Sequence, residues 1–252
     1  MKISIVTISF NQAGFLRKCI DSVLSQENVE VEYIVVDPGS TDGSREIIES
    51  YGDKIVRVFE ADKGPADGLN KGFQRATGDI FGFINSDDYF LLGALAKVRN
   101  HFERFGLDEF VSGSGFIEKA DGSRAAITPS KMSRIAFLYG ACTVFQQGTF
   151  FPAEAFRKVN GFNAENKTCW DGELFADLLC AGYKHEVIHD DLAVFRIYPG
   201  SISGSGRLEV PYQLDQKRIF REKMGRDYKP HDQLMQTIWR GRKVLLRMIG
   251  AR

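Results

Sequence analysis

The stretch IFGFINSDD, residues 80–88, decides how the first half of the chain is interpreted. Its first five residues, 80–84, are near-continuously apolar, as expected of a central parallel strand that is buried on both faces. The stretch ends in two neighbouring carboxylates, Asp87 and Asp88. Adjacent carboxylates repel each other and lose hydration at the end of a buried strand. A cation, or a ligand that carries one, would remove that cost.

The residues before this stretch alternate predicted strands with predicted helices. Short apolar runs predict strands at residues 3–9, 33–36 and 55–59. Apolar residues at helical spacing predict helices at about residues 14–25, after residues 42–44, and after Pro65, which the first turn of a helix tolerates. Strands separated by helices of this length indicate βαβ units. We therefore predict an α/β fold with a mostly parallel central sheet flanked by helices.

The second half of the chain predicts shorter strands and more helices. Strands are expected at residues 110–112, 116–118, 125–127 and 143–151, with a turn at 121–122. Helices are expected at about residues 154–159, 171–181 and 208–224, and glycines follow the first two in the position that stops a helix. No linker separates the halves, which predicts one domain with an appended C-terminal segment.

The composition excludes several classes of protein. The 252 residues are 43% hydrophobic and 26% charged, the usual globular mix, and the formal net charge of zero argues against nucleic acid as a partner. Four widely spaced cysteines predict no disulfide framework and favour a reducing compartment. Residues 1–10 alternate apolar and polar side chains, which predicts a strand and not a signal peptide. No apolar run approaches 18 residues, so no membrane span is expected.

Polar segments follow each of the four predicted strands of the first half. They are residues 9–11, 37–43, 60–64 and 85–88. In open parallel α/β sheets, ligands bind outside the carboxyl ends of the strands, so these four segments should meet at one ligand-binding edge.

The residue types at this edge narrow the choice of ligand. The chain has no G-x-G-x-x-G after its first strand and no G-x-x-x-x-G-K-[ST], which disfavours a dinucleotide-binding enzyme and a P-loop nucleotidase. A carboxylate pair suits Mg²⁺ or Mn²⁺, which take oxygen ligands and often share them with phosphates. The alternative is that Asp87 caps the next helix while Asp88 is solvated.

Several motifs in order carry a resemblance to a known family. They are SIVTISFNQAGFLRKCIDSVLSQ (4–26), EYIVVDPGSTDGS (32–44), EADKGPADGLNKGFQRATGDIFGFINSDD (60–88), QQGTFFPAEAFRKVNGFN (146–163), CWDGELFADLLCAGYK (169–184) and FRIYPGSIS (195–203). Together they resemble the family-2 inverting glycosyltransferases, which have the GT-A nucleotide-sugar fold. The resemblance covers about residues 1–205.

The resemblance implies an organisation and an activity. Residues 1–205 would form a GT-A domain with a donor-binding half at about 1–100 and an acceptor half at about 101–205, followed by a C-terminal helical segment at 206–252. The implied reaction moves a sugar from a nucleotide-diphospho-sugar to a saccharide or lipid-linked saccharide. The implied setting is bacterial polysaccharide or glycoconjugate biosynthesis. We expect a cytoplasmic location, and the basic C-terminal segment leaves open peripheral contact with the inner face of the cell membrane.

The resemblance also implies catalytic roles. Asp88 would ligate the divalent metal, Mg²⁺ or Mn²⁺, that bridges the two phosphates of the donor, and Asp87 would contact the ribose or assist the metal. Asp171 would be the general base that takes the proton of the acceptor hydroxyl. An alternative is that Asp171 is only the N-cap of its helix. Trp170 stands where the family has a glutamate, and would offer a flat stacking face.

Further positions are implied less strongly. The donor-side residues are Ser9, Phe10, Asn11, Asp37, Gly39, Lys63, Asp67, Asn70, Asp87 and Arg196, and the acceptor-side residues are Gln147, Trp170 and Glu173. Pro38 replaces an aspartate that reads uracil in some relatives, which leaves the donor base open. Tyr198 stands where relatives often have a histidine.

Two alternative functions remain open on the sequence. Trp170 and Tyr198 leave room for a nucleotide-binding module without transfer activity. A sugar nucleotidyltransferase would share the α/β sheet and the use of metal, although no basic glycine-rich triphosphate loop follows the first strand.

Two C-terminal segments each allow two interpretations. Residues 200–206 are rich in small side chains and predict either a lid over the donor or an ordinary flexible connection. Residues 237–252 carry five cations and no acid, with apolar residues between them. This composition predicts either an interfacial helix on anionic lipid or a helix docked on its own domain with a solvated basic face.

Overall fold

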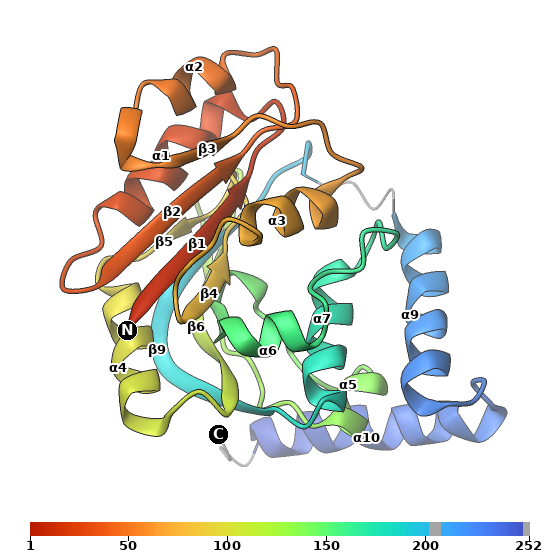
Figure 1. Ribbon diagram of the computed structural model, residues 1–252. Coiled ribbons are helices and arrows are strands. Elements are labelled where there is room, and N and C mark those ends of the chain that lie inside the picture. The colour runs from red at the N-terminus through yellow and green to blue at the C-terminus, as the bar shows by residue number, and fades with distance from the viewer. Residues whose placement is uncertain (202–207, 249–252) are drawn as a thin grey trace.

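The computed structural model describes residues 1–201 and 208–248, with side chains up to residue 242 (Figure 1). Its first half has the predicted alternation of strands and helices. The elements are β1 (Lys2–Ile8), α1 (Ala13–Leu24), β2 (Glu30–Val36), α2 (Ser44–Glu49), η1 (Gly52–Lys54), β3 (Val56–Val58), α3 (Pro65–Phe73), β4 (Ile80–Phe83), β5 (Tyr89–Phe90) and α4 (Ala94–Phe105). The second half contains β6 (Glu109–Lys119), β7 (Arg124–Ile127), α5 (Arg134–Leu138), η2 (Gln146–Gly148), β8 (Thr149–Pro152), α6 (Ala153–Lys158), α7 (Trp170–Cys180), β9 (Lys184–Ile197), α9 (Glu209–Met224) and α10 (Pro230–Met248).

The described strands form one mixed sheet. Its order is β3-β2-β1-β4-β8-β6-β9-β5, with β7 paired to β6. The first four strands in this order are parallel, as predicted, so their carboxyl ends lie at one edge. Beyond them β8 runs antiparallel to both β4 and β6, while β9 is parallel to β6. The predicted α/β class is therefore confirmed, and the parallel part of the sheet is the half that carries IFGFINSDD.

The sheet is covered by helices on both faces (Figure 1). On one face α1 and α4 bury Leu16 and Phe102 against sheet residues such as Ile5. On the other face α3, α6 and α7 bury apolar side chains, Phe73 and Phe156 among them, against the opposite side of the same strands. Successive residues of a strand point to opposite faces. An apolar run such as residues 80–84 is therefore needed to fill both cores.

Two predictions for the second half were wrong in their bounds. The strands expected at residues 110–112 and 116–118 are one continuous strand, β6, which passes through Gly113 and Gly115. These glycines permit close packing and do not end the strand, since a Cβ on Gly113 would lie 2.2 Å from a side-chain carbon of Leu192. The strand expected at 143–151 is confined to Thr149–Pro152, because residues 146–148 form a turn of 3₁₀ helix.

The last two helices form an L around α7 (Figure 1). Helix α9 packs on α7 and α5, and α10 follows after a turn at Gly225, whose φ is +69°. Across residues 1–201 and 208–248, no helix is both long and apolar enough to cross a membrane. Most of the lid expected at residues 200–206 lies outside the described residues.

Candidate active site

The predicted ligand-binding edge is assembled from the ends of β1, β2, β4 and β9. The register pairs Ile8 with Val36, so the segments after β1 and β2 start side by side. A hydrogen bond from the Asn11 backbone N–H to Ser40 Oγ (2.8 Å) joins these two loops, and Thr41 donates its N–H to Asn11 Oδ1 (2.9 Å). The end of β9 closes the edge from the far side of the sheet, through contacts to the aspartate pair.

Asp88 is held rigidly in the interior. Its carboxylate is fully buried, its Oδ1 accepts the backbone N–H of Arg196 (2.8 Å), and its Oδ2 accepts Gln147 Nε2 (2.9 Å). Burial, followed by the charge of the neighbouring Asp87, raises the pKa of Asp88 well above its ordinary value. Both oxygens of Asp88 are therefore already engaged by the protein, and the side chain is not solvated.

Asp87 is more accessible than its neighbour. It is half-buried, and its Oδ2 accepts the hydroxyl of Tyr198 (3.1 Å). Burial raises the pKa of Asp87, while the Tyr198 hydrogen bond and the charge of Arg196 act in the opposite direction. The described residues bring together no group of three His, Cys, Asp or Glu side chains. A metal at this pair would therefore draw its remaining ligands from a bound molecule or from water.

The Arg196 side chain lies between two aromatic rings beside the aspartate pair. Its guanidinium carbon is 4.8 Å from the centre of the Phe15 ring and 5.1 Å from that of Tyr89, and its Nε donates to the backbone carbonyl of Asp87. The Phe15 ring also packs against the Tyr198 ring, with 4.7 Å between the ring centres. Phe15 and Tyr89 were not predicted as site residues. From sequence alone, an aromatic residue on an amphipathic helix or in a short strand is assigned to the hydrophobic core.

Asp37 organises the loop after β2. The carboxylate is fully buried, and its Oδ1 accepts the backbone N–H groups of Gly39 (2.9 Å) and Ser40 (2.8 Å) and the Nε of Arg45 (3.1 Å). Gly39 has a φ of +139°, a conformation that a residue with a Cβ rarely adopts. Nearby, the Phe10 side chain is 59% exposed. An exposed aromatic ring at this edge offers a face on which a flat ligand can stack.

Three buried polar side-chain atoms have no hydrogen-bond partner within the described residues. They are Ser9 Oγ, Asp37 Oδ2 and Arg196 Nη2. Buried polar groups are normally satisfied, and an unmet one costs roughly 1–3 kcal/mol. All three belong to residues that the sequence analysis placed at the donor, at the ends of three different strands. Their coincidence at one edge indicates a site that a polar ligand completes.

Trp170, the neighbour of Asp171, packs against the end of β4. The Trp170 ring packs against Phe83 (5.4 Å between ring centres) and Phe162 (5.3 Å), and Phe83 ends β4 four residues before Asp87. Asp171 is half-buried, its Oδ1 accepts the Gly172 N–H (2.8 Å), and burial raises its pKa. The N-cap of α7 is Cys169, so Asp171 lies inside the first turn and is not the cap.

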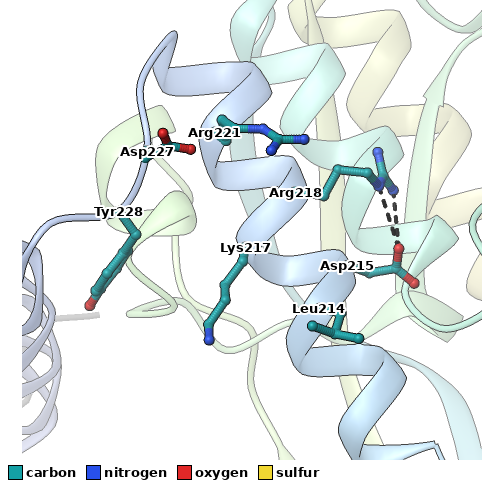
Figure 2. A pocket seen from close by; sticks show the side chains of 7 residues that line it. All are labelled: Leu214, Asp215, Lys217, Arg218, Arg221, Asp227 and Tyr228. Atoms are coloured by element: carbon teal, nitrogen blue, oxygen red, sulfur yellow. Dashed lines mark hydrogen bonds and ion pairs between the residues drawn. The ribbon is translucent and has the colours of Figure 1, made fainter.

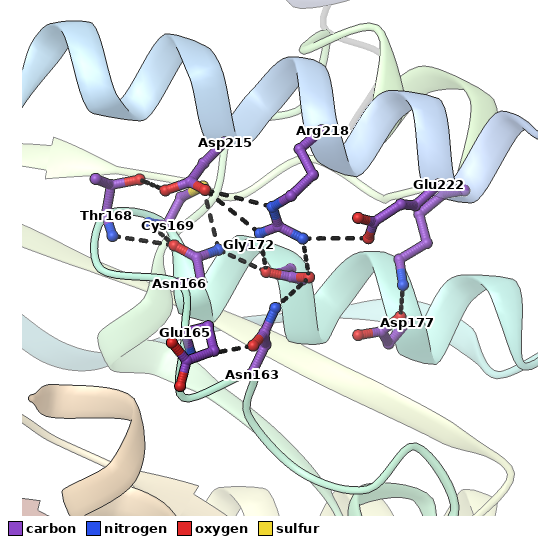
Figure 3. A network of polar contacts seen from close by, with 12 residues as sticks. Asn163, Glu165, Asn166, Thr168, Cys169, Gly172, Asp177, Asp215, Arg218 and Glu222 are labelled. Atoms are coloured by element: carbon purple, nitrogen blue, oxygen red, sulfur yellow. Dashed lines mark hydrogen bonds and ion pairs between the residues drawn. The ribbon is translucent and has the colours of Figure 1, made fainter. Parts of the chain in front are cut away.

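Glu173 lies in a closed network and is not open to an acceptor. Its carboxylate is 3% exposed and accepts both Nη atoms of Arg218 (2.8 and 2.7 Å), Asn166 Nδ2 (2.6 Å) and Asn163 Nδ2 (3.1 Å). Arg218 of α9 and the two asparagines of the loop before α7 all donate to this one carboxylate, and Figure 3 shows them as one network. Burial alone would raise the pKa of Glu173, but these hydrogen bonds outweigh it and lower the pKa. The network therefore fastens α9 to α7.

The remaining predicted residues divide into structural and accessible ones. Asn70 uses both ends of its amide on Phe162, donating to its carbonyl (2.8 Å) and accepting its N–H (2.9 Å), so it clamps a loop. Asp67 accepts the Lys63 backbone N–H (2.9 Å), and the Lys63 side chain is exposed beside α3. Gln147 lies in the site, but its amide supports Asp88.

Comparisons with known proteins identify the family of the chain and other structures with its fold. The sequence profile described as "Glycosyl transferase family 2" matches residues 4–159, which is more than half of the chain. The chain belongs to glycosyl transferase family 2. It is 28% identical over 216 residues to the uncharacterized glycosyltransferase alr2836 of Nostoc sp., covering 79% of this chain and 65% of that protein. It is 36% identical over 100 residues to the putative teichuronic acid biosynthesis glycosyltransferase TuaG of Bacillus subtilis, covering 38% and 39% of the two chains. The chain thus spans less than two thirds of the length of these curated relatives.

Solved structures of distant sequence share the fold of this family member. S. aureus TarS 1–349 in complex with UDP-GlcNAc has a TM-score of 0.73 and 17% identity, covering 97% of this chain and 72% of that chain. The mannosyltransferase PcManGT from Pyrobaculum calidifontis, in complex with GDP-Man and Mn²⁺, has a TM-score of 0.67 and 18% identity, covering 96% and 69%. At this identity the likeness establishes the GT-A-like fold alone.

Proposed function

We propose that this family-2 chain is an inverting glycosyltransferase, hexosyl or related, that uses a nucleotide-diphospho-sugar. The observation that carries the proposal is the set of unpartnered buried atoms on Ser9, Asp37 and Arg196. A nucleotide diphosphate has the complementary groups, because its base and ribose carry donors and acceptors and its phosphates accept from a guanidinium. The complexes of TarS with UDP-GlcNAc and of PcManGT with GDP-Man support the same class of donor.

We further propose that Asp87 is the ligand of Mg²⁺ or Mn²⁺ and that Asp88 supports it, which reverses the roles that the resemblance implied. Both oxygens of Asp88 are already hydrogen bonded, whereas Asp87 is only half-buried. The pKa of both groups is raised by burial, a cost that a bound cation would remove. When bound, such a cation neutralises negative charge on a leaving diphosphate. The Mn²⁺ in the PcManGT complex supports this proposal.

Asp171 is the proposed general base. In inversion the acceptor oxygen attacks the anomeric carbon, the bond to the diphosphate oxygen breaks, and its electron pair leaves with the nucleoside diphosphate. The hydroxyl proton passes to the Asp171 carboxylate, which no ion pair within the described residues engages. Burial raises the pKa of Asp171, which makes its carboxylate a stronger base.

The polymer setting is a further proposal. The name of TuaG associates that relative with teichuronic acid, which supports a saccharide or lipid-linked saccharide acceptor in bacterial surface-polysaccharide or glycoconjugate biosynthesis. The half-buried Trp170, which packs on Phe83 at the end of β4, is the residue that we propose lies on the acceptor side. We also propose that residues 1–100 contribute mainly the donor site and residues 101–205 the acceptor side, with residues 206–252 as the C-terminal helical segment.

The experiment is a donor screen. Purified protein is incubated with UDP-, GDP- and dTDP-sugars and Mn²⁺, and release of nucleoside diphosphate is followed with and without saccharide acceptors. We expect one donor class to be consumed. Asp171→Asn should slow this consumption about 10²–10⁴-fold and keep nucleotide affinity. Glu165→Gln should behave as wild type, because Glu165 is an exposed carboxylate in the loop before α7. Nucleotide binding without turnover would favour a silent binding module, and pyrophosphate formation from a nucleoside triphosphate would favour a nucleotidyltransferase.

A further inference from the structure

Helix α10 is amphipathic, but it packs its polar side against the protein, whereas a surface helix usually packs its apolar side there. Asp232 is fully buried, accepts the Tyr139 hydroxyl (2.6 Å), and pairs with Arg226 through both oxygens (2.6 and 2.7 Å). One and two turns later, Gln236 and Arg240 lie beside Gly140, where an added Cβ would be 3.8 and 3.2 Å from their side-chain nitrogens. Residues spaced by four share one side of a helix. The row 232-236-240 is therefore the side that docks on the domain.

The apolar side of α10 faces outward. Leu234 is 63% exposed and Ile238, four residues later, is 53% exposed. Of the 14 large apolar side chains that are exposed in the described residues, seven lie after residue 208, namely Val210, Tyr212, Leu214, Tyr228, Leu234, Met235 and Ile238. Scattered exposed apolar residues are ordinary, but a concentration on two successive helices and the turn between them marks an interaction surface.

The part of this surface that α10 contributes is positively charged. After residue 229 the sequence has five cations and one acid, whereas the rest of the chain carries a formal net charge of −4. The one acid is Asp232, which is buried and paired. Every accessible formal charge of that stretch is therefore cationic. Arg242 lies four residues after Ile238, and its guanidinium carbon is 5.2 Å from the centre of the Trp239 ring.

A cation-lined hollow adjoins α10. It has a volume of about 600 Å³ and lies between α9 and the turn before α10. Figure 2 shows Lys217, Arg221 and Tyr228 around it, with Leu214 at one end. Its two acids are Asp227 and Asp215, the second of which is paired with Arg218. Apolar and cationic groups thus lie together on α9 and the turn before α10.

We propose that α10 and the adjoining side of α9 dock on an anionic lipid bilayer. Leu234 and Ile238 would enter the boundary between headgroups and acyl chains, while Arg242, Lys217 and Arg221 meet lipid phosphates. A second copy of this chain fits this surface less well than anionic lipid does, since self-association would bring like cations together. The proposal goes beyond the sugar-transfer reaction and does not depend on it.

The test is vesicle co-sedimentation of the full chain at low salt. We expect binding to vesicles of 30% phosphatidylglycerol in phosphatidylcholine, at least tenfold weaker binding to pure phosphatidylcholine, and a similar loss at 0.5 M salt. The variant Leu234→Gln/Ile238→Gln removes the apolar side and keeps good helix formers. It should bind the anionic vesicles at least tenfold more weakly. The matched control is Leu92→Gln, which replaces an apolar residue that is 79% exposed elsewhere on the protein and should bind as wild type.

The outcomes separate docking from folding and from catalysis. Both substituted side chains are exposed, so the variant should keep the wild-type thermal midpoint and nucleotide affinity. Equal binding of wild type and variant to anionic vesicles would overturn the proposal, as would equal binding of wild type to neutral vesicles. A dimer in light scattering that the double variant abolishes, without any vesicle binding, would also overturn it and identify a second copy as the occupant. Failure of the donor screen would leave vesicle binding unchanged.

Discussion

Replacing Arg218 with methionine tests whether Glu173 is a structural group. The substitution keeps the aliphatic length of the side chain but removes the two Nη donors that reach Glu173. Asn163 and Asn166 remain, so the carboxylate keeps two neutral donors and loses its only cation partner in the described part of the chain. Glu173 is then a buried and unpaired charge between α7 and α9.

The expected cost is about 3 kcal/mol of unfolding free energy at pH 7.5. Removing one partner of a buried pair typically costs about 3–5 kcal/mol, and the lower end applies because the Arg218 side chain is 26% exposed and partly screened by water. In the wild type the pKa of Glu173 is lowered, so its contribution is present above about pH 4.3 and is lost as the pH falls through the folded-state pKa. In the variant the unpaired, buried carboxyl has a raised pKa. The difference between the two proteins should therefore shrink as the pH falls toward 4.5.

The assay is urea unfolding followed by circular dichroism at pH 7.5, 6.0 and 4.5. Arg221→Met is the matched control, because Arg221 is exposed on the same helix, and it should change the free energy of unfolding by less than about 0.5 kcal/mol. If Arg218→Met destabilises the protein no more than that control, or by an amount that does not depend on pH, Glu173 is not held by a buried ion pair that stabilises the fold. That result would also restore Glu173 as an acceptor-side candidate.

Three further predictions concern the site itself. Asp171→Asn should lower kcat about 10²–10⁴-fold without changing nucleotide affinity. Wild-type activity should rise with pH through the raised pKa of Asp171, since the base acts in its deprotonated form. A flat pH–rate profile would argue against Asp171 as the base. Tyr198→Phe should weaken Mn²⁺-dependent donor binding by about three- to tenfold in calorimetry, because Asp87 loses a hydroxyl donor; an equal loss without metal would contradict this. Asn70→Ala should lower the free energy of unfolding by about 1–3 kcal/mol with nucleotide affinity unchanged, because the backbone of Phe162 loses both partners; the opposite pattern would return Asn70 to the donor site.

The first half of the fold could be predicted because its pattern is local. A parallel strand buried on both faces must be apolar throughout, and residues 80–84 satisfy that rule. The long strand β9 was not predicted, because polar residues such as His189 and Asp190 interrupt its apolar pattern where it bulges against β6. Helix α4 was also not predicted, although its buried Leu95, Val98 and Phe102 recur at helical spacing.

The candidate site was predictable in position but not in the state of each side chain. Sequence order placed Asp87 and Asp88 at one edge, yet only the fold shows that Gln147 and the backbone of Arg196 occupy both oxygens of Asp88. Glu173 is a similar case, since its partner Arg218 lies 45 residues away in a helix with no motif of its own. Long-range pairing of this kind leaves no spacing signal in a single sequence.

The most direct test of the nucleotide site is calorimetry with UDP, GDP and dTDP in the presence of Mn²⁺, on wild type and on Ser9→Ala. We expect one nucleotide to bind and Ser9→Ala to weaken its binding by about three- to tenfold. The nucleotide-free variant should unfold no earlier than wild type, because the lost hydroxyl has no partner within the described residues. If no nucleotide binds, or if Ser9→Ala binds as tightly as wild type, the unpartnered atoms at the strand ends do not form a nucleotide site.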